Sequence, residues 1–333
     1  MGEIGIIKDY MKTFLVTGVA GFIASKVAEY LLDAGNCVVA LDNLNDYYDV
    51  RLKQHRLEQL KDYENFVFHP IDIEDKPALE GLFKEHNFDC VFNLAARAGV
   101  RYSMENPHVY MTTNVIGTLN LLECMKDKEN KKLVLASTSS LYAGQKMPFS
   151  EDLPVNTPIS PYAASKKAAE VTAYSYHHLY GIDVSIVRYF TVYGPAGRPD
   201  MSIFRFIKWI DTGQPLELFG TGEQSRDFTY IDDIARGTIL ASRPLGYEII
   251  NLGGGKEPTT LLEVIHSIEQ ALGKKAKIEH KPFHKADLME TQADANKAQK
   301  LLGWKAEVSI QEGLQASVDW YFANKSWLKD VVV

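Results

Sequence analysis

Short apolar runs alternate with longer amphipathic stretches along the first 190 residues of the chain. The runs are rich in valine, leucine and phenylalanine, which is typical of strands buried on both faces of a parallel sheet. They lie at residues 13–17, 37–43, 66–72, 89–99, 132–138 and 183–190. The stretches between them have the helical period, and the clearest are 22–34, about 106–126 and 161–180. The alternation predicts an α/β fold with a doubly wound, mainly parallel sheet.

The pattern loosens beyond Pro195 into a mixed region. A helix near 204–212, a strand in LELFG, the string RDFTYIDD, a strand in YEIINLG and three further helices are expected there. We therefore predict a domain at residues 11–190 and a smaller mixed α/β lobe at residues 191–325, with about 228–255 returning to the first domain. Two interleaved parts of this kind form a cleft in which a ligand can bind.

The first predicted strand ends in the string TGVAGFIA, which a helix follows directly. Gly18 and Gly21 lie in the turn, and Phe22 and Ile23 open the helix. A glycine turn between a strand and a helix N-terminus receives a dinucleotide pyrophosphate in the Rossmann fold. The glycine motif alone is a weak signal, but the second strand ends at Asp42, where a carboxylate can bind a ribose 2′-hydroxyl and repel a 2′-phosphate. The pattern favours NAD over NADP.

Further cofactor contacts are expected where the other strands end, because open α/β sheets bind ligands at their carboxyl edge. Asp72 ends the third predicted strand and faces the adenine, although a helix cap is an equally good interpretation. The remaining expected cofactor contacts are Asn43, Ile73, Leu94, Ala95 and Ala96.

The string PYAASK begins the predicted helix 161–180, with Ser160 as its cap. Tyr162 and Lys166 are four residues apart and share one helical face. A nearby ammonium lowers the pKa of a phenol, so this pair could supply a base. A surface tyrosine and lysine would give the same pattern by chance. The run of hydroxyl residues 137–140 just upstream adds possible donors to a substrate, although such a run can also be an ordinary loop.

The composition limits the other classes of function. The chain has 333 residues, a net charge of −7 and a pI near 5.8, which argues against binding to nucleic acid or anionic membranes. No apolar run has the roughly 18 residues of a membrane span. Cys37, Cys90 and Cys124 are interpreted as reduced residues of a cytoplasmic protein. No metal site is expected, and residues 1–10 are given no function.

Several longer strings carry a family resemblance. TGVAGFIA, NLAARAGVRYS, PYAASK and RDFTYIDD together resemble the extended short-chain dehydrogenases/reductases of the nucleotide-sugar epimerase group, over residues 11–321. DNLNDYYDVRLK and RYFTVYGPAGRPDM are similar to UDP-glucuronate 4-epimerases in particular. The resemblance implies a UDP-sugar substrate, retained NAD, a 4-keto intermediate and no added metal.

The resemblance also implies roles for single residues. Tyr162 is similar to the general base of the family, Lys166 to its partner on the nicotinamide ribose, and Thr138 to the residue that binds the reacting hydroxyl. Arg226 resembles the diphosphate-binding arginine, with a surface ion pair as the alternative. The sugar carboxylate is expected against Ser139, Ser140 and Thr191, with Arg198 and Arg101 as weaker candidates.

Some alternatives stay open at this point. The related decarboxylases and dehydratases carry acidic residues where this chain has Ser139 and Ser140, whereas a UDP-galactose 4-epimerase would use the same catalytic residues. A non-catalytic NAD-binding sensor on this fold would usually lack the tyrosine and lysine. His284 and Lys285 stand where relatives place a second phosphate-binding arginine, which leaves that contact open. A homodimer formed through the helices 106–126 and 161–180 is also expected.

Overall fold

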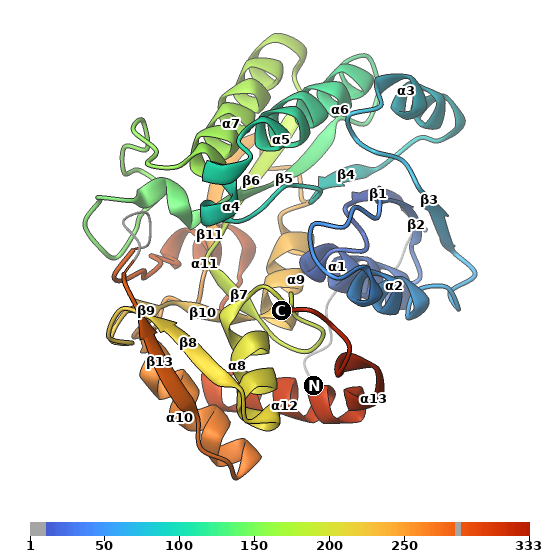
Figure 1. Cartoon of the computed structure of the whole chain (residues 1–333). Coiled ribbons are helices and arrows are strands. Elements are labelled where there is room, and N and C mark those ends of the chain that lie inside the picture. Colours follow the sequence, from blue (N-terminus) through green and yellow to red (C-terminus); the bar gives the residue numbers. More distant parts are fainter. Residues whose placement is uncertain (1–10, 284–287) are drawn as a thin grey trace.

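The computed structural model describes residues 11–283 and 288–333. Its centre is a seven-stranded sheet in which every neighbouring pair of strands is parallel (Figure 1). In spatial order the strands are β11 (Tyr247–Leu252), β6 (Asp183–Tyr189), β5 (Lys132–Thr138), β4 (Cys90–Asn93), β1 (Thr13–Thr17), β2 (Cys37–Leu41) and β3 (Phe66–His69). The predicted doubly wound parallel sheet is confirmed.

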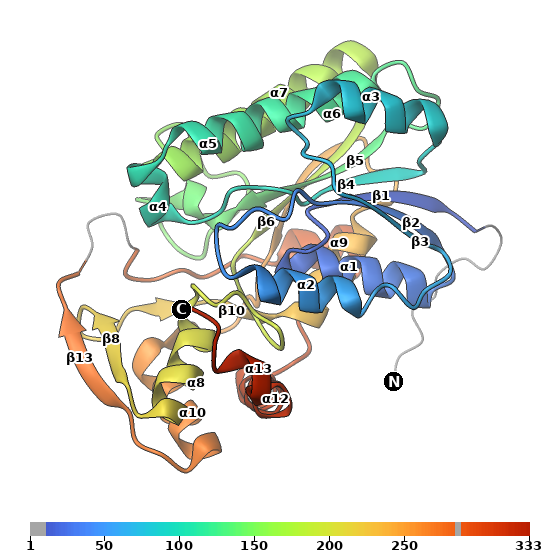
Figure 2. The same ribbon diagram turned by 45° about the vertical axis from the view of Figure 1, so that its right-hand side comes forward.

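Helices cover both faces of this sheet, as Figure 2 shows. One face carries α1 (Phe22–Asp33), α9 (Ile231–Leu240) and α11 (Asn296–Leu302), and the other carries α3 (Lys76–Glu85), α6 (Thr118–Met125) and α7 (Pro161–Tyr180). Successive strand residues serve opposite faces: Val16 joins the core under α1, whereas Leu15 joins the core under α6. Both are fully buried, which explains why the strands read as unbroken apolar runs.

The long helix expected at about 106–126 is present from His108 to Met125, and a π-helical turn lies in its middle. After α4 (Val100–Glu105) come α5 (His108–Met111), a π-helical turn η1 (Thr112–Gly117) and then α6. The wide turn directs the Asn114 side chain to the backbone of Arg97, which it binds at 2.8 and 3.0 Å. Turns of this type often occur beside functional sites.

The third strand also ends earlier than its apolar pattern predicts. Pro70 follows His69 directly and has no N–H to extend the ladder, so β3 ends at His69. Asp72 therefore lies in the loop beyond the strand and not at its end. Its carboxylate accepts the Glu74 amide at 2.9 Å, in a turn that leads to α3.

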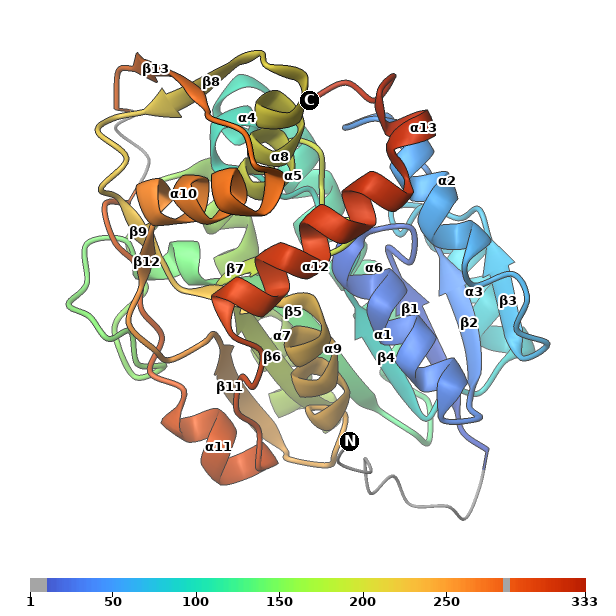
Figure 3. The same ribbon diagram turned by 90° about the horizontal axis from the view of Figure 1, so that it is seen from below.

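The second part of the chain builds a smaller lobe with its own apolar core (Figure 3). Its helices are α8 (Ser202–Thr212), α10 (Leu261–Leu272), α12 (Ile310–Ala323) and α13 (Lys325–Leu328). Its short strands are β7 (Thr191–Tyr193) with β10 (Phe228–Tyr230), β8 (Pro215–Phe219) with β13 (Lys277–Lys281), and β9 (Ser225–Arg226) with β12 (Thr259–Thr260). The domain boundary near residue 190 stays a prediction.

The helix α2 (Val50–Glu58) lies between the two parts of the molecule. It follows β2 in the chain, and Figure 3 shows it beside α13. The ring of His55 lies 5.0 Å from that of Trp327, and the side chain of Arg51 binds the carbonyl of Asp330. Within the described residues, no helix has both the length and the apolar character that crossing a bilayer requires.

A buried ion pair joins α7 to the sheet. Arg188 of β6 donates Nε and Nη2 to the two carboxylate oxygens of Glu170 at 2.9 and 2.8 Å, and both side chains are 1% exposed. Ser137 of β5 donates to the same carboxylate at 2.7 Å, and Arg188 reaches the hydroxyl of Tyr142 at 2.8 Å. The pair thus fixes α7 against β5 and β6, next to Thr138, which follows Ser137 on β5.

Candidate active site

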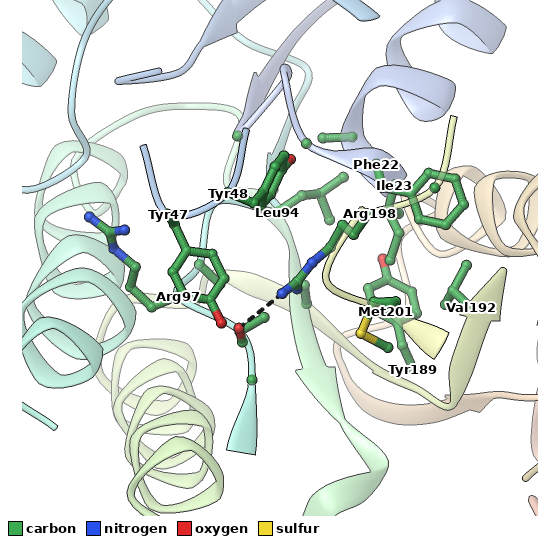
Figure 4. A pocket seen from close by; sticks show the side chains of 18 of the residues that line it. Phe22, Ile23, Tyr47, Tyr48, Leu94, Arg97, Tyr189, Val192, Arg198 and Met201 are labelled. Atoms are coloured by element: carbon green, nitrogen blue, oxygen red, sulfur yellow. Dashed lines mark hydrogen bonds between the residues drawn. The ribbon is translucent and has the colours of Figure 1, made fainter. Parts of the chain in front are cut away.

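A cavity of about 440 Å³ opens at the carboxyl edge of the sheet, between the sheet and the smaller lobe. The strand order reverses between β1 and β4, and this switch point is where doubly wound sheets bind nucleotides. Most of the expected site residues line the cavity: Gly18, Gly21, Phe22, Ile23, Asp42, Asn43, Asp72, Ile73, Leu94, Ala95, Ala96, Thr138, Ser139, Ser140, Tyr162, Lys166, Thr191 and Arg198. Figure 4 shows part of this wall.

The glycine turn packs backbone against backbone. Gly18 has φ +71°, and a Cβ atom there would lie 2.7 Å from Cα of Ala95. A Cβ on Gly21 would lie 2.8 Å from the carbonyl oxygen of Gly18. A side chain fits at neither position, so the turn leaves the open, N–H-lined approach to helix α1 that a pyrophosphate requires. These residues fit a bound dinucleotide.

Asp42 directly follows β2 and is 8% exposed. Its carboxylate accepts the amides of Ala20 at 3.1 Å and Leu44 at 2.8 Å. Beside it, Asn43 donates to the carboxylate of Asp72 at 2.6 Å. The two acidic residues therefore share one wall of the cavity, with Asp42 tied to the glycine turn.

Helix α7 has the predicted limits, with Ser160 accepting the Ala163 amide at 3.2 Å and Gly181 at φ +67°. It brings Tyr162 and Lys166 to the cavity wall beside Thr138. The buried ammonium of Lys166 donates to the carbonyl of Ala136 on β5 at 3.0 Å. The hydroxyl of Thr138 lies close enough to the Tyr162 phenol to influence its pKa.

The expected lowering of the tyrosine pKa by Lys166 is wrong for this structure. Burial raises the pKa of Tyr162 above its usual value of 10, and the Thr138 hydroxyl and the charge of Arg198 only partly oppose that effect. Burial also lowers the pKa of Lys166 to about 8, against the charge of Glu170. In the protein alone the phenol is therefore protonated at neutral pH, and the lysine lies near its titration range.

A group of hydroxyls and one guanidinium also lines the cavity. Ser139 and Ser140 form the start of the short helix η2 (Ser139–Tyr142), where Thr138 donates to the hydroxyl of Ser140 at 3.1 Å. Thr191 begins β7. Arg198 donates to the carbonyl of Ala98 at 3.2 Å, and Figure 4 shows its guanidinium reaching towards Tyr47.

Two of the expected substrate arginines lie outside the cavity lining. The guanidinium of Arg101 lies 3.8 Å from the ring centre of Phe219 on β8. Arg226 donates to the backbone carbonyls of Ser225 and Met289. The predicted roles of both arginines stay predictions, and His284 and Lys285 lie outside the described residues.

Sequence reasoning missed a polar group around the loop that follows β2. Lys53, 5% exposed, donates to the carbonyl of Asn45 at 2.7 Å, and Arg97 donates to the side chain of Asn45 at 3.0 Å. Tyr47 and Tyr48 flank Arg198, whose guanidinium lies 5.5 and 5.8 Å from their ring centres. The string DNLNDYYDVRLK contained Asn45, Tyr47, Tyr48 and Lys53, and NLAARAGVRYS contained Arg97, but only as part of the resemblance.

The sheet, the glycine turn and the tyrosine and lysine on α7 together define the class: a dinucleotide-binding protein of the short-chain dehydrogenase/reductase type. A family model described as GDP-mannose 4,6 dehydratase matches residues 15–317. The chain belongs to this family, in its nucleotide-sugar epimerase group. A UDP-glucuronate 4-epimerase of Thermodesulfobacterium geofontis is 61% identical over 97% of this chain and 100% of the relative.

Solved structures show the same relationship. The UDP-glucuronic acid 4-epimerase of Bacillus cereus in complex with UDP-glucuronic acid and NAD is 38% identical, with a TM-score of 0.88 over 94% of this chain and 99% of that one. The UDP-glucose 4-epimerase of Thermotoga maritima with UDP-glucose is 31% identical, with a TM-score of 0.85 over 94% and 99% of the two chains. The resemblance drawn from the sequence is confirmed.

Proposed function

We propose that the protein is an NAD-dependent UDP-glucuronate 4-epimerase that interconverts UDP-glucuronate and UDP-galacturonate. The observation that carries the proposal is the convergence of Thr138, Tyr162 and Lys166 with a hydroxyl-rich wall in one cavity. The 61% identity to a UDP-glucuronate 4-epimerase supports the choice of the uronate. The matched Thermotoga maritima structure has UDP-glucose bound, which makes UDP-glucose the competing substrate to test.

The glycine turn, Asp42 and Lys166 would hold the cofactor, with the remaining contacts at Asn43, Asp72, Ile73 and Leu94–Ala96. NAD, when bound, would accept a hydride from C4 of the sugar and return it to the other face. With its phenol deprotonated, a state that the positive charge of a bound nicotinamide would favour, Tyr162 would accept the proton of the 4-hydroxyl as the 4-keto sugar forms and return it afterwards. Thr138, which lines the cavity beside Tyr162, would orient that hydroxyl. Proton transfer by a positioned base contributes about 10²–10⁴-fold in rate.

The direct test is incubation with UDP-glucuronate followed by NMR of the products. We expect UDP-galacturonate to accumulate without added cofactor, because the NAD is regenerated in each cycle. Formation of UDP-xylose would contradict the proposal. So would good turnover of UDP-glucose beside none of UDP-glucuronate.

The hydroxyls of Ser139, Ser140 and Thr191 would bind the sugar carboxylate. A 4-keto uronate is a β-keto acid, and it loses CO₂ most readily when the carboxylate is desolvated and the C–C bond that carries it stands perpendicular to the plane of the ketone. Hydrogen bonds to a charged group contribute about 1.5–3 kcal/mol each and would keep the carboxylate in place. The proposal is that these hydroxyls both select the uronate and protect the intermediate.

Thr191→Val is therefore expected to reduce kcat/KM for UDP-glucuronate by about tenfold, the equivalent of one such bond. The binding of UDP-glucose, which lacks the carboxylate, should change little. The share of decarboxylated 4-keto pentose among the products should rise, as measured by mass spectrometry. Equal losses on both sugars, with no additional CO₂ released, would assign Thr191 a structural role only.

We also propose a homodimer formed by α7 and the segment α5–η1. Both carry exposed apolar side chains: Met111 is 40% exposed, Ile116 46%, Val171 49% and Tyr174 53%. Exposed apolar patches of this kind are typical of contacts between subunits.

We expect light scattering to give about twice the 37.4 kDa mass of one chain. Ile116→Lys with Val171→Lys should shift the mass towards one chain, whereas a parent that is already monomeric would contradict the assignment.

We also propose that the protein acts in the cytoplasm, where UDP-sugars are made. The three cysteines in the described part of the chain are free thiols, and Cys90 is buried. This state is typical of a reducing compartment.

A further inference from the structure

Arg56 of helix α2 is a buried arginine that lies between the glycine turn and the loop that carries Arg198. It is 3% exposed, and its guanidinium makes five hydrogen bonds. Nε and Nη2 donate to the carbonyl of Ala196 at 3.0 and 2.8 Å, and Nη2 also reaches that of Gly197 at 3.3 Å. Nη1 donates to the carbonyl of Ala20 at 2.9 Å and to the hydroxyl of Tyr48 at 2.7 Å. All of these acceptors are neutral.

On the cofactor side, Arg56 holds the glycine turn. Both backbone groups of Ala20 are engaged, since its N–H donates to Asp42 at 3.1 Å and its carbonyl accepts from Arg56. The next amide, that of Gly21, donates to the carbonyl of Gly18 at 2.8 Å. The orientation of the peptide between Ala20 and Gly21 is thereby fixed from both sides, and with it the start of helix α1.

On the sugar side, Arg56 holds the loop that carries Arg198. Ala196 has φ +55°, a left-handed conformation that costs a non-glycine residue free energy. The two hydrogen bonds from Arg56 to its carbonyl stabilise this conformation. Arg198 follows two residues later and donates to Ala98 at 3.2 Å and to Asp200 at 3.0 Å. Tyr48 lies under both guanidinium groups, at 5.6 Å from Arg56 and 5.8 Å from Arg198.

We infer that Arg56 is a positioning residue that couples the binding of the dinucleotide to the binding of the UDP-sugar. The inference rests on the proposed function, because it takes the glycine turn as the cofactor side and Arg198 as the sugar side. A planar guanidinium suits this role because its donors point in fixed directions and reach both loops at once. A ligand that stabilises one conformation of the glycine turn would then also stabilise one conformation of the Arg198 loop, because the same rigid guanidinium is bonded to both.

The coupling can be measured without turnover, as exchange of bound NAD for isotopically labelled NAD with and without saturating UDP. UDP lacks the sugar but retains the diphosphate. In the parent we expect UDP to slow the exchange by at least about fivefold, the lower end of usual coupling strengths. In Arg56→Met the ratio should fall to about one, and kcat/KM for the epimerisation should fall by about 100-fold. Arg56→Lys retains the charge and most of the stem, yet should lose most of the ratio.

Lys208→Met is the matched control. Lys208 is another buried cation that donates to backbone carbonyls, those of Leu328 at 3.2 Å and Lys329 at 3.3 Å, but these belong neither to the glycine turn nor to the loop of Arg198. This variant should melt at a lower temperature and keep the parent's exchange ratio. A parent ratio of one, or an unchanged ratio in both Arg56 variants, would overturn the inference. A parent that shows the coupling but does not epimerise UDP-glucuronate would support the inference and contradict the proposed function.

Discussion

Tyr162→Phe is expected to lower the rate of epimerisation by about 10²–10⁴-fold, because it removes the phenol oxygen that we propose as the acceptor of the 4-hydroxyl proton. The ring stays, so its edge-to-face packing on Tyr110, with ring centres 6.0 Å apart, should be kept. The binding of UDP-glucuronate should therefore change little. Initial rates followed by NMR, together with calorimetric titration of the sugar nucleotide, measure the two quantities separately.

Tyr110→Phe is the control for this variant. It also removes a phenol oxygen, one that donates to the carbonyl of Gly99 at 2.9 Å, but Tyr110 does not belong to the cavity lining. We expect it to lose some stability and to keep its activity within a few-fold of the parent. Near-normal turnover in Tyr162→Phe would show that another group is the base.

Glu170→Gln is expected to produce the largest loss of stability, about 3–5 kcal/mol in the free energy of unfolding. The substitution leaves the Arg188 guanidinium buried with its charge uncompensated, which is the costly way to break a buried pair. Urea unfolding measures the difference. Glu58→Gln, which breaks the exposed pair of Glu58 with Lys61, should cost about 0–1 kcal/mol.

Glu170→Leu combined with Arg188→Met removes both charges. Replacing a buried ion pair by apolar residues is often neutral or stabilising, so most of the lost stability should return. A loss in the double variant as large as that in Glu170→Gln would mean that shape, and not charge, makes the pair necessary. A loss below about 1 kcal/mol in Glu170→Gln would mean that the site is not as dry as its exposure indicates.

The sequence predicted those parts of the molecule that depend on local rules. The strand, glycine turn and helix around Gly18 follow from backbone conformation, and the limits of α7 follow from its cap at Ser160 and its end at Gly181. Because strand ends meet at one edge of a parallel sheet, the relative placement of Asp42 and Thr138 could also be anticipated.

Contacts between distant segments could not be predicted in this way. Helix α2 has a polar sequence, yet Lys53 and Arg56 are buried because loops from elsewhere in the chain supply their hydrogen-bond acceptors. Similarly, the pKa of Tyr162 depends on burial under residues from several elements and not only on its neighbour in the helix. The π-helical turn η1 is stabilised by the contact of Asn114 with Arg97, which no helical period reveals.

The place of β11 at the edge of the sheet has a consequence for synthesis on the ribosome. Strand β6 ends at Tyr189, but its outer partner β11 begins only at Tyr247, after most of the small strands have been made. At about 5–20 residues per second, the nascent chain spends some seconds with an unpaired edge of apolar strand residues. Unpaired edges recruit other strands, so this interval is when the newborn chain is most open to aggregation and to chaperones. A gene cut near residue 190 would make that state permanent.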